Sequence, residues 1–419
     1  MTKYFIFAGE VSGDLHGSHL IRALQLEQGD IPVQISGVGG PRMRQEKFDC
    51  FLPMEEFQVM GFSDVFCSLP RLWKLFYKIR DFILKTKPSC VILIDYPGFN
   101  LRLAQALRKK GFTGKLVQYI CPTVWAHGKN RIEILNAHYD LLLSIFPFEV
   151  DYFTQEVKAP PEVKAPPIVR DYNSKDCVNL PSSTAVSRLK IEYIGNPLVE
   201  TILAHSYQDD WIAQMGLPVD RELIALFPGS RLGEIQRHAP QQLSIAAKLK
   251  QRHPNLHFAL SCAQDSLREP LIRLIQQSPL RLNDDLHLIA PQYHYDLMKN
   301  CKTALAKSGT VALELALHGV PTVIHYELST LNYLFAKYIL KLSLSHYCIV
   351  NIIGHQTIFP EFIGRGISTD KIKEQLEYIH FNPLPYQHIQ NLCKDIKEKL
   401  GMKPSHLCAV KAIEELMKY

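Results

Sequence analysis

The chain has 419 residues, of which 47% are hydrophobic and 21% are charged, and its formal net charge is +6 at pH 7. This length exceeds one ordinary hydrophobic core and predicts two domains, and the composition is normal for a soluble, well-packed protein. The modest positive charge fits an anionic ligand or an anionic membrane surface, but it is too weak and too dispersed to indicate a nucleic acid.

The cysteines and the apolar runs of the sequence indicate the cellular compartment of the protein. The ten cysteines include no Cys-x-x-Cys pair, which predicts reduced thiols in a cytosolic protein. The opening "MTKYFIFAGE" lacks the pattern of a signal peptide. The most apolar region, "LNYLFAKYILKLSLSHYCIVNII", is interrupted by Lys337, Lys341 and His346, so we expect no membrane-spanning helix and at most peripheral membrane contact.

Short β-rich runs alternate with helical patterns along the chain. The expected strands are "KYFIFA", "VQISGV", "CVILID", "KLVQYI" and "DLLLSIF", followed by "IEYIG", "LIALF", "LHFALS", "LHLIA", "TALAK" and "VPTVIHY". Continuous apolar strands separated by helices predict parallel sheets of five or six strands, and therefore two doubly wound α/β domains. The helix "FNLRLAQALRKKG" has Asn100 as its expected N-cap and Gly111 as its stop.

A proline-rich segment precedes the division between the two halves, which we place before "YIGNPLVE", at 192/193. The string "EVKAPPEVKAPP" repeats one hexapeptide twice and is followed by polar sequence. Four prolines and alternating charge do not form a core, so segment 156–190 is expected to be an extended surface insertion. A partner-binding role is the alternative.

The loops after the first and third expected strands carry carboxylates, and ligands of such sheets bind at the carboxyl ends of strands. In "FIFAGEVSGDLHG" the loop holds Glu10, Ser12, Gly13 and Asp14, with Ser12 as a possible helix cap. Two carboxylates would repel a phosphate, so we expect this loop to form the polyol side of a cleft.

Asp95 ends the apolar strand of "VILIDYPGFN". An apolar sheet behind a carboxylate favours a raised pKa and base character. The alternative is that Asp95 only caps the turn and the helix that follow it.

Two later turns form the expected phosphate side. In "LFPGSRLGEIQRHAP", Gly229 and Ser230 lead to Arg231, whose planar fork suits phosphate oxygens, and Pro240 is expected to open the next helix. The alternative is a surface turn with an exposed arginine.

In "ALAKSGTVALELALHGVP", Ser308, Gly309 and Thr310 form a turn into a helix that stops at Gly319. The free amides at this helix start would bind a diphosphate. Glu314 lies one helical turn further on the same face, where its carboxylate would accept hydrogen bonds from ribose hydroxyls. The alternative is a capped core helix with a solvated glutamate.

The sequence predicts no metal site and no cofactor. It contains no His-Glu-x-x-His string and no paired-acid motif, and its histidines are scattered. We expect His16 and His19 to lie on a helix surface.

Taken together, the motifs resemble those of lipid-A-disaccharide synthases, a family of bacterial glycosyltransferases. The matching strings, in the family's order, are "AGEVSGD", "GVGGPRM", "VMGFSDV", "IDYPGFN", "YICPTVWAH", "FPFE", "YIGNPL", "PGSRLGEI", "SGTVALELAL" and "NIIGHQTIFPE". The resemblance implies a GT-B fold of two Rossmann-like domains facing a cleft. The first, 1–192 with the returning C-terminal helix 405–419, would bind the acceptor, and the second, 193–404, would bind the UDP-sugar.

The resemblance also implies a reaction. UDP-2,3-diacylglucosamine and 2,3-diacylglucosamine 1-phosphate would give the β-1,6-linked disaccharide 1-phosphate and UDP. Asp95 would be the catalytic carboxylate, with Glu10 or Asp14 as the alternative base. Arg231 would contact the diphosphate, and the donor site would further include Ser308, Thr310, Glu314 and Asn351. Two residues depart from the family: Gly98 replaces a common Asp and His127 replaces a common Trp, so either these positions are not essential or the activity of this chain is altered.

Acylated substrates imply a membrane surface, expected at the cytoplasmic face of the inner membrane. In "RLWKLFYKIRDFILK", residues 71–85, apolar residues form a broad helical stripe opposite four basic ones. We expect Trp73, Phe76 and Tyr77 to contact anionic lipid. The alternatives are burial of the stripe in the core or against another subunit, for instance in a homodimer, and contact through the weaker candidate "LNYLFAKYILKLSL". The rival functions are another UDP-sugar enzyme, such as an epimerase, and a non-catalytic nucleotide-sugar or lipid-binding protein.

Overall fold

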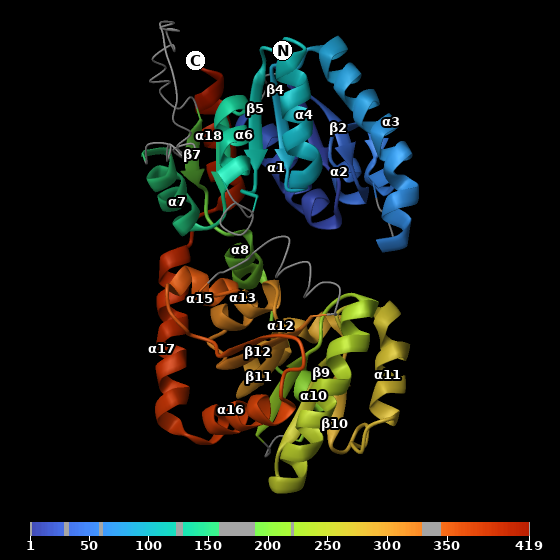
Figure 1. The fold of residues 1–419 in the computed structure, drawn as a ribbon, viewed down its shortest axis with the longest axis vertical. Coiled ribbons are helices and arrows are strands. Elements are labelled where there is room, and N and C mark those ends of the chain that lie inside the picture. Colours follow the sequence, from blue (N-terminus) through green and yellow to red (C-terminus); the bar gives the residue numbers. More distant parts are fainter. Residues whose placement is uncertain are drawn as a thin grey trace, which may run out of the picture. The chain divides into compact units, whose positions relative to one another are not determined.

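The computed structural model describes residues 2–28, 33–57, 62–122, 129–158, 189–218, 222–328 and 345–418. The chain divides into two compact units, Met1–Asn196 with Lys403–Tyr419, and Pro197–Met402. This division falls four residues after the one placed from the sequence. We describe each unit by itself (Figure 1), and the expected cleft between them stays a prediction.

The first unit contains a seven-stranded sheet in the order β3-β2-β1-β4-β5-β6-β7. The strands are β1 (Thr2–Ala8), β2 (Val33–Gly39), β3 (Asp49–Pro53), β4 (Cys90–Ile94), β5 (Lys115–Tyr119), β6 (Leu141–Ser144) and β7 (Lys190–Tyr193). All pairs are parallel, as the continuous apolar runs predict. The sequence analysis missed β3, a short edge strand whose residues are mostly half-exposed and which therefore lacks a continuous apolar run.

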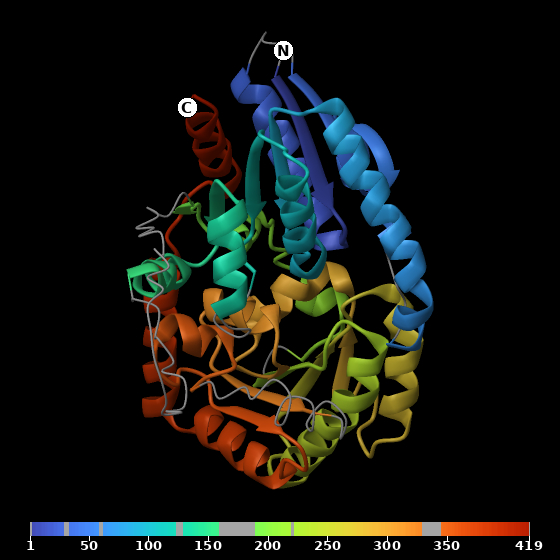
Figure 2. The ribbon, with the colours of Figure 1, turned by 45° about the horizontal axis from the view of Figure 1, so that its top comes forward.

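Helices cover both faces of this sheet. They are α1 (Val11–Gln28), α2 (Pro41–Gln45), α3 (Phe62–Thr86), α4 (Pro97–Lys109), α6 (Lys129–His138), α7 (Pro147–Lys158) and α18 (Ser405–Met417), with a short 3₁₀ helix at Met54–Phe57. Successive side chains of β1 enter two separate cores: Phe5 and Phe7 pack with residues of α3 and α4, whereas Tyr4 and Ile6 pack with residues of α1 and α18. Figure 2 shows α18, in red, beside the first sheet, which confirms the expected return of the C-terminal helix.

The second unit contains a six-stranded parallel sheet in the order β10-β9-β8-β11-β12-β13. Its strands are β8 (Leu223–Phe227), β9 (His257–Ser261), β10 (Leu286–Ile289), β11 (Thr303–Lys307), β12 (Thr322–Glu327) and β13 (Glu361–Gly364). Its helices are α8 (Pro197–Ala204), α9 (Trp211–Gln214), α10 (Leu232–Arg252), α11 (Arg268–Gln276), α12 (His294–Asn300), α13 (Thr310–Leu317), α15 (Ile349–Gly354), α16 (Thr369–Phe381) and α17 (Pro383–Leu400). The two doubly wound α/β units confirm the predicted fold class.

Two helix starts differ from the sequence expectation. α4 begins at Pro97, so Asn100 lies inside its first turn and is not the N-cap, whereas Gly111 follows the helix end with φ +81° as expected. α10 begins at Leu232, so Pro240 lies inside the helix and does not open it. Favourable cap and first-turn residues recur along a sequence, and packing decides which of them is used.

Two expectations lie outside the described residues. These are most of the proline-rich insertion, 159–188, and the apolar segment 329–344. Among the helices that the structure describes, none combines the length and the apolar character needed to cross a membrane.

Candidate functional site

Asp95 stands at a strained corner at the carboxyl end of β4. Asp95 and Tyr96 have φ angles of 45° and 47°, so two consecutive residues with side chains adopt the left-handed conformation. Such residues cost on the order of 1–3 kcal/mol each and persist only where their surroundings hold them. Here the Asp95 N–H donates to the Tyr119 carbonyl at 2.9 Å, and the buried amides of Gln118 and Asn100 donate to the Asp95 carbonyl.

The carboxyl group of Asp95 has a perturbed pKa. Burial raises its pKa, and a backbone hydrogen bond at Tyr96 opposes this rise only in part. The N-cap residue of α4 is Tyr96, without a side-chain cap hydrogen bond. A half-buried carboxylate with raised pKa suits a general base. The hydrogen bond at Tyr96 leaves a turn-capping contribution of Asp95 open.

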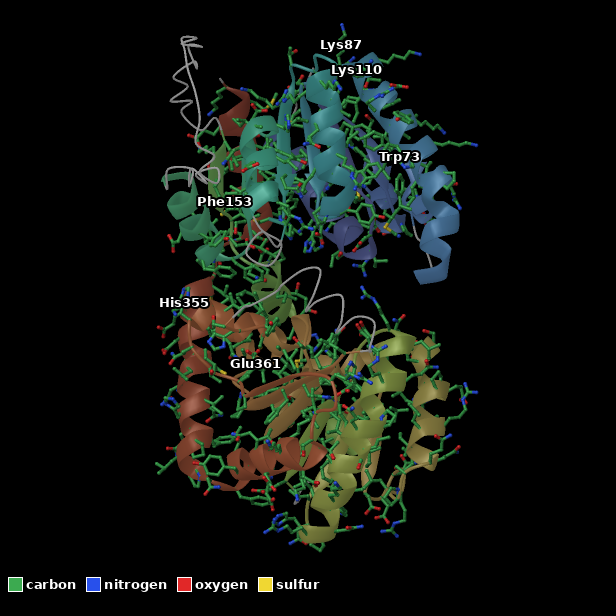
Figure 3. All side chains as sticks on the ribbon, in the orientation of Figure 1. Trp73, Lys87, Lys110, Phe153, His355 and Glu361 are labelled. Atoms are coloured by element: carbon green, nitrogen blue, oxygen red, sulfur yellow. The ribbon has the colours of Figure 1, made fainter. Side chains whose placement is uncertain are left out.

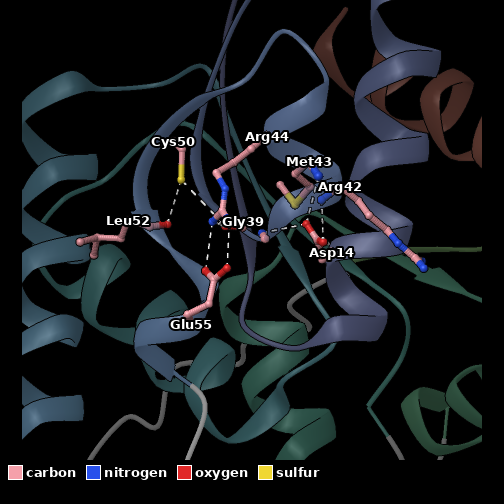
Figure 4. A network of polar contacts seen from close by, with 9 residues as sticks. Asp14, Gly39, Arg42, Met43, Arg44, Cys50, Leu52 and Glu55 are labelled. Carbon is pink, nitrogen blue, oxygen red and sulfur yellow. Dashed lines mark hydrogen bonds and ion pairs between the residues drawn. The ribbon is translucent and has the colours of Figure 1, made fainter. Parts of the chain in front are cut away.

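Asp14 has a different role from the one expected. Its side chain is 2% exposed, and Oδ1 accepts hydrogen bonds from the N–H groups of Gly40 (2.7 Å) and Met43 (3.1 Å), while Oδ2 accepts one from Arg42 (3.0 Å). Figure 4 shows this carboxylate at the start of α2. The structure therefore corrects the acceptor-side assignment, because Asp14 anchors the "GVGGPRM" segment to α1 and its oxygens are already bonded to the main chain.

The other three predicted residues of this loop have different environments. A Cβ added at Gly13 would lie 3.3 Å from Ala8 Cβ, so Gly13 permits close packing of α1 on β1. Ser12 is exposed inside the first turn of α1, which begins at Val11. Of the four predicted loop residues, Glu10 lines a pocket that we describe below.

The second unit has a pocket of about 590 Å³ at the carboxyl ends of its central strands. The predicted residues that line it are Gly229, Ser230, Arg231, Gly309, Thr310 and Glu314. Ser308 directly precedes the lining residues of the α13 start and is not itself one of them. This volume lies within the range of small-molecule sites.

The Pro228–Arg231 turn is held by two residues that the sequence analysis missed. The Ser230 N–H donates to Glu234 Oε2 at 3.0 Å, and Lys307 Nζ lies 3.0 Å from Glu234 Oε1. Burial raises the pKa of Glu234, but the bonds from Lys307 and Ser230 outweigh it and leave that pKa lowered. The Arg231 side chain is 83% exposed, and its Nη1 lies 3.9 Å from Glu234 Oε1.

Glu314 lies in the wall of the same pocket. Its carboxylate accepts a hydrogen bond from the Tyr295 hydroxyl at 3.1 Å and lies 3.5 Å from His294 Nε2. Burial raises the pKa of Glu314, but His294, Tyr295 and His318 outweigh it, so its pKa is lowered. An ionised, partly buried carboxylate is a suitable acceptor for ligand hydroxyl groups.

Asn351 is not part of this pocket, which corrects its assignment to the donor site. It is 0% exposed, its Oδ1 accepts from the N–H groups of Ile358 and Phe359 at 2.8 Å each, and its Nδ2 donates to the Phe359 carbonyl. Glu361, labelled in Figure 3, accepts from the Cys348 N–H at 2.7 Å, just before α15. In the "NIIGHQTIFPE" motif, Asn351 thus ties α15 to the chain that leads into β13.

The apolar stripe of α3 divides between core and surface. Trp73, labelled in Figure 3, is 48% exposed and Tyr77 is 46% exposed, whereas Phe76 is 8% exposed and belongs to the core. The expected membrane contact of Phe76 is thus corrected. Four of the five basic side chains of this segment, Arg71, Lys74, Lys78 and Lys85, are exposed, whereas Arg80 is half-buried.

Within the described residues, no group of three or more His, Cys, Asp and Glu side chains could hold a metal ion. His16 and His19 do not lie on an open helix surface as expected. Burial lowers the pKa of His16 to about 4, and His19 Nδ1 lies 2.9 Å from His406 Nε2 of α18. His127 lies outside the described residues.

The comparisons with known proteins agree with the sequence motifs. A family model described as Lipid-A-disaccharide synthetase matches residues 4–159 and 184–412. A lipid-A-disaccharide synthase of Geobacter sulfurreducens is 31% identical over 400 residues, which cover 95% of this chain and 93% of that protein.

The enzyme of the same name from Chlamydia trachomatis serovar D is 38% identical over 362 residues, 86% of this chain and 53% of that protein, so the chain spans about half the length of the chlamydial relatives it matches. A solved structure of S. aureus MnaA with UDP has a TM-score of 0.61 at 12% identity and covers 100% of this chain and 97% of that one. This likeness shows the fold alone, which is the GT-B fold.

Proposed function

Because the chain belongs to the lipid-A-disaccharide synthetase family, we propose that it condenses UDP-2,3-diacylglucosamine with 2,3-diacylglucosamine 1-phosphate. The products are the β-1,6-linked disaccharide 1-phosphate and UDP. The observation that carries this proposal is the pair of chemically distinct sites, a strained carboxylate with raised pKa in the first unit and an amide- and cation-lined pocket in the second.

In the second unit, the pocket suits the UDP part of the donor. The start of α13 offers amides at Gly309 and Thr310, and Arg231 adds an exposed cation. Glu314 accepts hydrogen bonds from the ribose hydroxyl groups. As the sugar–phosphate bond breaks, negative charge grows on the diphosphate, and these fixed donors stabilise that charge.

In the first unit, Asp95 acts as the general base. It removes the proton of the acceptor's 6-hydroxyl while that oxygen attacks the anomeric carbon of the donor. Attack from the face opposite the diphosphate inverts the configuration in one displacement. A positioned base of this kind contributes about 10²–10⁴ in rate. Glu10 is the alternative base.

The substrates of this proposal carry acyl chains, so the protein must meet a membrane surface. We propose peripheral binding at the cytoplasmic face of the inner membrane. The exposed Trp73 and Tyr77, together with the basic side chains of α3, support this contact.

The test is incubation of the purified protein with the two lipid substrates and detection of the disaccharide 1-phosphate by mass spectrometry. We expect the product with the native chain and a loss of at least 100-fold in rate with Asp95→Asn. Binding of both substrates without product would instead indicate a non-catalytic binding protein. An epimerised UDP-sugar in place of the disaccharide would indicate the rival enzyme class.

A further inference from the structure

A second pocket lies in the first unit, and its lining includes the residues that directly follow the proposed base in the chain. Its volume is about 360 Å³, and its lining residues come from the end of β1, from α3 and from the start of α4. They are Glu10, Leu72, Trp73, Phe76, Tyr96, Pro97, Gly98, Phe99 and Arg102. The contribution of Tyr96, Pro97 and Gly98 ties the pocket to the Asp95 corner, because these three residues follow Asp95 in the chain.

Aromatic side chains form most of the walls of this pocket. The Phe76 and Phe99 rings pack edge to face at 5.5 Å, Trp73 packs on Phe76 at 5.7 Å, and Tyr96 lies 6.1 Å from Phe99. Phe76 and Phe99 also belong to or pack against the core of the unit, so they are held from behind. A pocket with fixed aromatic walls is preformed for an apolar ligand group.

Two charged residues belong to the same lining. Glu10 and Arg102 are both exposed, and they add a carboxylate and a guanidinium to an otherwise apolar surface. Carboxylates accept hydrogen bonds from hydroxyl groups, and arginine binds anionic oxygens such as those of a phosphate. The lining thus matches a molecule with an apolar tail and a head that is both hydroxylated and anionic.

We infer that this pocket binds one acyl chain of the acceptor, with the sugar head held near Asp95 by Glu10 and Arg102. The inference rests on the proposed function and adds to it a place for the chain. A bilayer would contact a broad exposed surface, and a second copy of the protein would bring its own side chains. Neither fits a small concave site with charged groups in its lining as well as a single amphiphile does.

Gly98 makes the inference testable. It lines the pocket, it is exposed, its φ is not in the left-handed region, and a Cβ added there would meet no atom within 4 Å. Gly98→Leu therefore fills the pocket without straining the backbone. Gly233 is a matched control, because it is also the second residue of a helix with open space at its Cβ, and it lies in the other unit.

The experiment measures binding of two probes by calorimetry, each below its aggregation concentration. The probes are N-dodecanoylglucosamine 1-phosphate and N-acetylglucosamine 1-phosphate. Each methylene that leaves water contributes about fourfold in affinity. We expect the native chain to bind the dodecanoyl probe at least 100-fold more tightly than the acetyl probe. Gly98→Leu should reduce this preference at least tenfold, whereas Gly233→Leu should keep it. Thermal unfolding verifies that both variants fold.

Equal affinity of the native chain for both probes would overturn the inference, as would a preference for the dodecanoyl probe that Gly98→Leu leaves intact. If Gly98→Leu lost only its binding to phosphatidylglycerol vesicles and kept its affinity for both probes, the pocket would be a contact with the bilayer. A change of oligomeric state alone, measured by sedimentation, would assign it to a second copy. Turnover without chain-length preference would refute only this inference, whereas chain-dependent binding without any disaccharide would refute only the proposed function.

Discussion

The side-chain amide of Asn100 donates a hydrogen bond to the main-chain carbonyl of Asp95, five residues earlier in the chain. The same amide lies 3.4 Å from the Ile94 carbonyl, and the Asn100 carbonyl accepts from the Tyr139 hydroxyl at 3.0 Å. Asn100 thus connects the start of α4 to the end of β4. It holds the left-handed corner that presents the Asp95 carboxyl group.

Asn100→Leu should therefore affect both stability and turnover. The substitution removes one of the two side-chain amides that donate to the Asp95 carbonyl and leaves only the weaker bond from Gln118, which costs about 1 kcal/mol. We expect a lower free energy of unfolding in urea and a fall of at least tenfold in kcat, because the corner can relax. The control is Asn300→Leu, whose amide bonds the Asp296 carbonyl at the end of α12. If the Asn100 variant keeps its kcat, Asn100 does not position Asp95.

The raised pKa of Asp95 predicts the pH dependence of turnover. A base works in its ionised form, so kcat/KM should rise with pH through the folded-state pKa, which burial places above the ordinary value of 3.8. On acidification, kcat/KM should therefore begin to fall at a higher pH than it would if the base were an aspartate with an ordinary pKa. Glu10→Gln should keep this acidic limb. A profile that loses the limb in Glu10→Gln would assign the base to Glu10.

The raised pKa of Asp95 also predicts how the stability of the fold depends on pH. Because the folded state binds the Asp95 proton more tightly than the unfolded state, ionisation of Asp95 destabilises the fold at neutral pH. We expect Asp95→Asn to have a higher Tm than the native chain at pH 7. This difference should shrink as the pH falls through the raised pKa. Equal melting temperatures at all pH values would contradict the burial of the charge.

Gly229 should tolerate no side chain. Its φ is +124°, and an added Cβ would lie 2.6 Å from Glu234 Oε2. Gly229→Ala should displace Glu234 or the turn and weaken UDP binding at least tenfold in calorimetry. Gly233→Ala, four residues further and with open space at its Cβ, is the control and should bind UDP normally. Comparable UDP affinity of both variants would remove the turn from the donor site.

Asp14 should be a structural residue. Asp14→Ala removes three hydrogen bonds from main-chain amides, two of them at the start of α2, and should lower the free energy of unfolding by about 2–3 kcal/mol. The folded fraction of Asp14→Asn, which keeps an acceptor oxygen, should turn over at close to the native rate. A stable Asp14→Asn variant without activity would restore Asp14 as a candidate base.

Glu314 should act through the ribose hydroxyls. We expect Glu314→Gln to weaken UDP binding about tenfold and to leave the affinity for 2′,3′-dideoxyuridine diphosphate nearly unchanged. The control is Tyr295→Phe, which keeps the carboxylate but removes the hydroxyl that donates to it. It should have a smaller effect of the same kind. Equal losses for both nucleotides would place the Glu314 contact elsewhere on the ligand.

The sequence by itself determined the fold class and the main ligand loops. Continuous apolar runs such as "YFIFA" and "CVILI" become central strands, because only a parallel sheet covered on both faces buries every side chain of a strand. The turns at Asp95, Gly229 and Gly309 follow such strands, so their positions at the carboxyl ends of the sheets follow from the parallel order alone.

Tertiary structure decided what each polar or aromatic residue of the motifs does. The sequence analysis assigned Asp14 and Asn351 to ligand sites. In the structure the polar atoms of both side chains bond main-chain groups instead. These groups lie 26 to 29 residues from Asp14 and 7 to 8 residues from Asn351 in the chain. Phe76 has the same apolar character as Trp73, and only the packing of α3 on Phe99 buries one and exposes the other. Local pattern fixes where a residue stands on a helix or strand, whereas its partners come from segments that only folding brings together.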